Sequence, residues 1–94
     1  MIELTLTCSA CPEQYDAMLN GQPVGYLRLR HGYFTVACPD VGNDVVYGSR
    51  TKGDGCFDKD ERHAELNKAV LAIYKWLSEQ EGEPIYRIID DRVR

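Results

Sequence analysis

A chain of 94 residues with a formal net charge of −4 is long enough for one small domain and too short for two. Its 44% hydrophobic content is typical of a folded protein, and its acidity excludes a protein that coats nucleic acid by bulk charge. No apolar run reaches the roughly 18 residues of a transmembrane helix, and no secretory signal is visible, so we expect a cytoplasmic protein without membrane contacts.

The first half of the chain has the pattern of short strands joined by tight turns. Residues 2–7 alternate strictly between apolar and polar side chains, the period of a half-buried strand. Further strands are predicted at residues 14–19, 24–30, 33–38 and 45–48. Asn20-Gly21 and His31-Gly32 are typical of tight hairpin turns. Together these features predict an antiparallel meander of three to five strands.

One long helix is predicted after the strands, from Asp58 to about Gln80. Its apolar side chains recur at steps of three and four, at Leu66, Ala69, Val70, Ile73, Trp76 and Leu77. Asp58 and Glu61 have the spacing of a capping box, and Gly82 and Pro84 end the pattern. The predicted fold class is α+β, with this helix packed on one face of the meander.

The predicted single domain, residues 1–94, divides into four segments. These are an N-terminal strand with a CxxC turn (1–12), the meander (13–48), the helix (58–80) and a peripheral tail (85–94). Residues 85–90 in the tail are apolar enough for a last strand.

The stretch KGDGCFDKDE at residues 52–61 has some of the spacing of a calcium loop. Aligned on Gly55, however, the loop would have Arg50 and Lys52 at its first and third ligand positions, where oxygen ligands are needed. A strand rather than a helix also precedes it. We therefore interpret the stretch as a glycine turn that leads into a capped helix.

The four cysteines, Cys8, Cys11, Cys38 and Cys56, suggest a zinc site as an alternative to plain thiols. Cys8 and Cys11 form a CxxC knuckle, which can hold zinc through two thiolates. The other two cysteines stand apart, and Cys38 falls on the inward face of a strand, where a buried thiol is ordinary. We expect no cofactor, with zinc as the alternative.

The sequence contains no recognisable pattern of catalytic residues. His31 falls in a turn and His63 on the exposed start of the helix, and no spacing pairs either with a nucleophile. No phosphate-binding loop is present. We expect that the protein is not an enzyme.

The sheet face opposite the helix is the predicted partner-binding surface. Leu27, Leu29, Phe34, Val36 and Cys38 would face the helix, which leaves Tyr26, Arg28, Arg30, Tyr33 and Thr35 on the other side. Tyrosine and arginine are favoured at protein–protein hot spots, and they can also stack bases and hold phosphates. A plain solvated surface is the third interpretation. Residues 22–53 have four cations against two anions, between acidic flanks.

GYLRLRHGYFTVACP, followed by VVYGSRTKGDGCFDKDERHAELNKAVLAI, resembles the arm-type DNA-binding domains of phage and transposon tyrosine integrases. That family has an AP2-like three-stranded sheet and a helix, and the resemblance covers about residues 13–80. This chain departs from it in being acidic, and we expect no recombinase domain behind it. The stretch is also similar to small orphan proteins of phages and mobile elements, which implies binding to host or element machinery, including inhibition of host defence.

The sequence thus predicts a small binding protein that uses Tyr26, Arg28, Arg30 and Tyr33. A protein partner is favoured because of the negative net charge, and nucleic acid is the alternative. The acidic helix face (Asp58, Asp60, Glu61 and Glu65) is a second candidate surface, which could mimic DNA phosphates toward a basic partner. A bare edge strand could also pair with a second copy.

Overall fold

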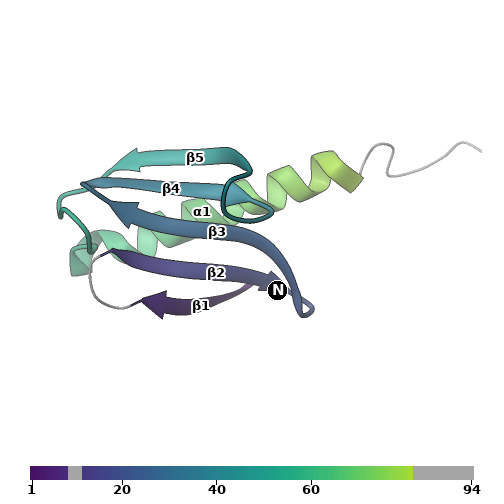
Figure 1. The fold of residues 1–94 in the computed structure, drawn as a ribbon, viewed down its shortest axis with the longest axis horizontal. Helices are drawn as coiled ribbons and strands as arrows, with labels where there is room; N and C mark the ends of the chain where they lie inside the picture. The colour runs from purple at the N-terminus through teal and green to yellow at the C-terminus, as the bar shows by residue number, and fades with distance from the viewer. Residues whose placement is uncertain (9–11, 82–94) are drawn as a thin grey trace, which may run out of the picture.

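Five antiparallel strands form one sheet in the computed structural model, which describes residues 1–8 and 12–81 (Figure 1). The strands are β1 (Glu3–Cys8), β2 (Glu13–Leu19), β3 (Gln22–Arg30), β4 (Tyr33–Cys38) and β5 (Asp44–Arg50). Their order across the sheet is β1-β2-β3-β4-β5, so each strand pairs with its neighbours along the chain. The predicted meander is confirmed.

Two hairpin turns use left-handed backbone at both central positions. Asn20 and Gly21 have φ values of 53° and 80°, and His31 and Gly32 have φ values of 53° and 74°. These conformations match the twist of the flanking strands, so the strands continue without splaying. Glycine adopts them readily, and asparagine and histidine are enriched there relative to other non-glycine residues. Both turns lie where the sequence predicts them.

Strand β5 extends past its predicted end, and its pairing with β4 includes one extra residue. The register shifts between Val36 and Ala37, which makes Val46 the extra residue of a β-bulge. Beyond the bulge the pairing continues as far as Arg50. The longer strand brings one more arginine onto the sheet than the sequence indicated.

Within the described residues the sheet is followed by one helix, α1 (Lys59–Glu81), which covers one of its faces (Figure 1). The Asp58 amide donates a hydrogen bond of 3.1 Å to the Glu61 carboxylate, the contact expected of a capping box. The same carboxylate accepts the Lys52 amide at 3.3 Å. The stretch KGDGCFDKDE therefore turns the chain into a capped helix, as predicted.

The core lies between the sheet and the helix. Its most deeply buried members include Leu27, Leu29, Phe34, Val36, Ala69 and Ile73. The side chains predicted to face the helix are buried there, Cys38 among them. Gly25 permits a close approach of the two layers, since a Cβ at that position would lie 2.8 Å from Cδ1 of Ile73.

Two predicted features fall outside the described residues. These are the tail at 85–94, with its strand at 85–90, and the centre of the CxxC turn at 9–11. In the part of the chain that the structure describes, no helix is both long and apolar enough to span a membrane.

Candidate partner-binding face

The face of the sheet opposite α1, called here the open face, presents the predicted binding residues together. Because Leu27 and Leu29 are buried toward the helix, the alternation of β3 places Tyr26, Arg28 and Arg30 on the open face. The register of the sheet adds residues from β4 and β5 on the same side. The four predicted residues are thus gathered on one surface, and Arg50 joins them.

Arg30, Tyr33 and Arg50 form a row across three strands at one end of the sheet. Tyr33 lies opposite Arg30 on one side and opposite Arg50 on the other. The Arg50 guanidinium carbon is 6.0 Å from the centre of the Tyr33 ring, within the range of a cation–π contact. A Cβ on Gly48 would lie 2.5 Å from the Tyr33 hydroxyl, so the missing side chain makes room for the phenol. The ring is therefore held in place while 45% of the residue stays exposed.

Arg28 and Tyr26 lie next to this row, and Tyr26 pairs with Asp16 of β2. Arg28 is half-buried and sits between Gln14 on β2 and Thr35 on β4. The Tyr26 hydroxyl donates a hydrogen bond of 2.6 Å to Oε1 of Gln14, which fixes its ring. The tyrosine is thus a rigid neighbour of Arg28, which forms no ion pair within the described residues.

The charges of the open face are divided between its two halves. The ion pairs found among the described residues are Lys52–Asp60, Arg62–Glu13 and Lys68–Glu65. Within that part of the chain the arginines of the open face therefore have no acidic partner. Glu3 and Asp16 alternate with helix-facing residues on β1 and β2, which places them on the open face as well. A basic zone on β3–β5 thus borders an acidic zone on β1–β2.

A buried carboxylate fixes the end of the sheet where the arginine row lies. Glu13, only 3% exposed, accepts hydrogen bonds from the Tyr15 hydroxyl (2.5 Å) and the Phe57 amide (3.0 Å). Arg62 donates to it from Nε at 2.9 Å and from Nη2 at 3.1 Å. One side chain thereby joins β2, the loop before the helix and the first turns of α1.

The electrostatics of this group favour the charged form of Glu13. Burial alone would raise the pKa of Glu13, but the hydrogen bonds from Arg62, Tyr15 and the Phe57 amide together hold the pKa below its ordinary value. Burial and the neighbouring carboxylate raise the pKa of Tyr15 to about 12. Sequence reasoning missed this group, since a single acid at a strand start gives no sign of an arginine 49 residues away.

Cys8 and Cys38, two of the four cysteines in the zinc alternative, lie far apart in the sheet. Cys8 of β1 lies in the same cross-strand row as Thr35 of β4. Cys38 lies three residues further along β4, which is three strands away from β1. Their backbones are thus about 17 Å apart, whereas the sulfurs around one zinc lie about 4 Å apart. Cys11 is outside the described residues, in which no group of three or more metal-ligating side chains is found. Burial, with help from Asp44, raises the pKa of the Cys38 thiol to about 11.

The acidic helix face is mostly occupied by contacts within the molecule. The Lys52 ammonium lies 2.7 Å from Asp60, and Glu61 accepts the backbone amide of Asp58. Glu65 is 9% exposed and accepts a hydrogen bond from a tyrosine of β5. Three of the four carboxylates predicted there are therefore engaged, and this face is a weaker candidate than the open face.

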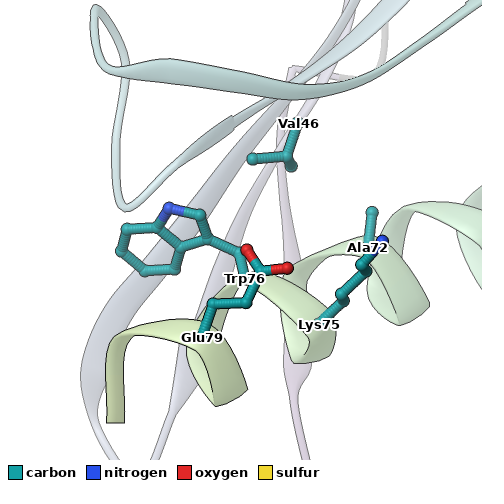
Figure 2. A pocket seen from close by; sticks show the side chains of 5 residues that line it. All are labelled: Val46, Ala72, Lys75, Trp76 and Glu79. Atoms are coloured by element: carbon teal, nitrogen blue, oxygen red, sulfur yellow. The ribbon is translucent and has the colours of Figure 1, made fainter. Parts of the chain in front are cut away.

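A pocket of about 250 Å³ lies between β5 and the second half of α1 (Figure 2). Val46, the residue of the bulge, extends toward the helix, where the Trp76 indole and Ala72 complete the apolar lining. Lys75 and Glu79 add one charge of each sign. The pocket has room for an apolar side chain.

Comparison with known protein families, with curated proteins and with solved structures finds no match for this chain.

Proposed function

We propose that this chain is a non-enzymatic binding protein that holds a macromolecular partner, and in the first place another protein, on its open face. The observation that supports this most directly is a group of three arginines that have no acidic partner among the described residues and lie beside two fixed tyrosines. Unpaired guanidinium groups on one surface provide donors for a partner's acceptors. Because they stand on strands, little backbone conformational freedom is lost when a partner binds.

A protein partner is favoured over nucleic acid by the charge distribution. A nucleic acid strand that crossed the whole face would meet Glu3 and Asp16, and the net charge of −4 would repel it at a distance. Three arginines also allow only about three phosphate contacts, so a single strand would bind with a salt slope near −2. A protein surface of limited size avoids both difficulties.

The resemblance to proteins of phages and mobile elements supports a more specific hypothesis. Under this hypothesis, the partner is a protein of the host cell or of the mobile element. One role of this kind is the inhibition of a host defence system. A cytoplasmic location and a dimer formed through an edge strand, β1 or β5, belong to the same set of hypotheses.

The proposal is tested by capturing partners with the tagged protein from nuclease-treated lysate and measuring what is retained. The Arg28→Ala, Arg30→Ala double variant is compared with Lys59→Ala, Lys68→Ala, which changes the net charge equally on exposed helix positions. We expect the first to lose a partner that the second keeps. Equal retention by both variants would remove the open face as the binding surface.

A further inference from the structure

A small cavity lies at the corner of the open face, beside the arginine row. It has a volume of about 190 Å³ and is lined by Pro12, Arg30, His31, Asp54 and Gly55. This is below the roughly 300–1,000 Å³ of sites that bind cofactors or drug-sized molecules. It corresponds to about six water molecules, which is room for one side chain.

The walls of the cavity are fixed by backbone contacts. The Gly32 amide donates to the Asp54 carbonyl at 2.6 Å, which ties the β3–β4 turn to the loop before the helix. The Glu13 amide donates to the Gly55 carbonyl at 2.7 Å, so the start of β2 is tied to the same loop. His31 is held at a φ of 53° by the turn. The cavity is therefore formed before any ligand arrives.

The chemistry of the lining favours an anionic group that also approaches a hydrogen-bond acceptor. Arg30 provides a guanidinium with no acidic partner among the described residues, and the His31 imidazole adds a second nitrogen donor. Asp54 also lines the cavity and can accept a hydrogen bond from a donor of the ligand, such as a backbone amide. A carboxylate on a peptide has both properties.

The arginine row extends this site across the sheet. Arg30 and Arg50 lie on strands separated by β4, so their backbones are about 10 Å apart. In an extended peptide, side chains two residues apart lie on one side at a spacing of about 7 Å. Flexible arginine side chains can bridge the difference, so two carboxylates at alternate positions could contact both ends of the row.

We propose that the open face binds an extended acidic segment of a partner protein, with one carboxylate side chain in the cavity beside Arg30 and His31 and a second at Arg50. This proposal rests on the proposed function and specifies the partner's chemistry. The acidic zone of Glu3 and Asp16 confines such a segment to β3–β5.

The test uses a short labelled peptide of alternating glutamate and threonine, and its matched peptide with glutamine in place of glutamate. Fluorescence anisotropy measures the binding of both, and of a short oligothymidylate, to the full chain at low salt. We expect the glutamate peptide to bind at least about tenfold more tightly than the glutamine peptide, as hydrogen bonds to charged groups imply. Amide chemical shifts should change at residues 28–33 and 48–55.

Two variants locate the site and one serves as a control. Arg30→Ala and His31→Asn should each weaken binding of the glutamate peptide, and asparagine preserves the left-handed turn. Lys59→Ala removes an equal charge from the helix and should have little effect. Equal binding of the two peptides, or equal effects of Arg30→Ala and Lys59→Ala, would overturn the proposal.

Two results separate this proposal from the general one. Tighter binding of oligothymidylate than of the glutamate peptide would overturn the acidic-segment proposal and assign the face to nucleic acid. If the Arg28→Ala, Arg30→Ala variant loses its captured partner while the glutamate peptide fails to bind, the proposed function stands and the acidic segment is excluded.

Discussion

Replacing Glu13 with glutamine is the most direct test of how the sheet, the loop and the helix are held together. The variant keeps the size and shape of the side chain but removes its charge. The carboxylate accepts four hydrogen bonds, from Tyr15, Phe57 and twice from Arg62. The side-chain oxygen of glutamine can accept two of these four hydrogen bonds. The glutamine NH₂ group replaces the other carboxylate oxygen, so it faces groups that themselves donate hydrogen bonds.

The expected loss is about 2–3 kcal/mol of unfolding free energy. Hydrogen bonds to charged groups contribute about 1.5–3 kcal/mol each, and a buried donor left without an acceptor adds to the cost. The Arg62 side chain is 40% exposed, so water can replace part of the hydrogen bonding that it loses. The expected loss of unfolding free energy is therefore smaller than the about 3–5 kcal/mol typical of breaking a fully buried ion pair. Against a typical total of about 5–15 kcal/mol this is a large fraction.

Urea unfolding followed by far-ultraviolet circular dichroism measures the difference. Glu79→Gln, at an exposed helix position, is the control and should change stability by less than about 0.5 kcal/mol. Because the pKa of Glu13 is lowered in the folded protein, its contribution is fully present above the unfolded pKa of about 4.3. It is lost as the pH falls through the folded value, so wild type and Glu13→Gln should converge in acid. Equal stability of Glu13→Gln and the control at neutral pH would refute the assigned role.

Three further predictions concern single side chains. Gly25→Ala should lower the free energy of unfolding by about 1 kcal/mol, because the new methyl group crowds Ile73. Ile73→Val removes the crowded Cδ1 atom, so the double variant should lose less stability than the sum of the two single variants. Additive losses in urea unfolding would contradict this explanation. Cys38 is 1% exposed and should react with a thiol reagent only when the protein unfolds. If the native protein has a fast-reacting thiol that is missing in Cys38→Ala, Cys38 is accessible and its assigned burial is wrong. Tyr15, with a pKa of about 12, should ionise at a higher pH than an unfolded tyrosine, whose pKa is about 10. Its contribution to stability is therefore fully present below about pH 10 and is lost as the pH rises toward about 12. An absorbance titration compared with Tyr15→Phe measures that tyrosine, and an unchanged late phase in the variant would argue against it.

The sequence predicted those parts of the fold that depend on local signals. Period-two alternation, the Asn20-Gly21 turn and the Asp58–Glu61 spacing each act within a few residues, and each lies in the structure where it was expected. The open face followed from the same alternation once one helix was assigned to one side of the sheet. Its composition was therefore predictable, although its use for binding stays a prediction.

What the sequence could not predict depends on register and on distant pairs. Arg50 was missed as a binding residue because the bulge at Val46, which sets the later register of β5, has no local signature. Glu13 and Arg62 meet only because the helix packs across the meander. The separation of Cys38 from Cys8 likewise follows from strand order and not from spacing along the chain.

The strand order also has a consequence for the way the chain reaches its native state. Because every strand pairs with its neighbour in sequence, the sheet can assemble by closing short loops, which costs little chain entropy. The distant closures are those of the helix, from Arg62 to Glu13 and from Tyr74 to the amide of Ile2, 72 residues apart. We therefore expect docking of the helix to complete folding after the sheet has formed. Until that step the apolar side of the meander is exposed, and the chain is then most prone to association with other chains.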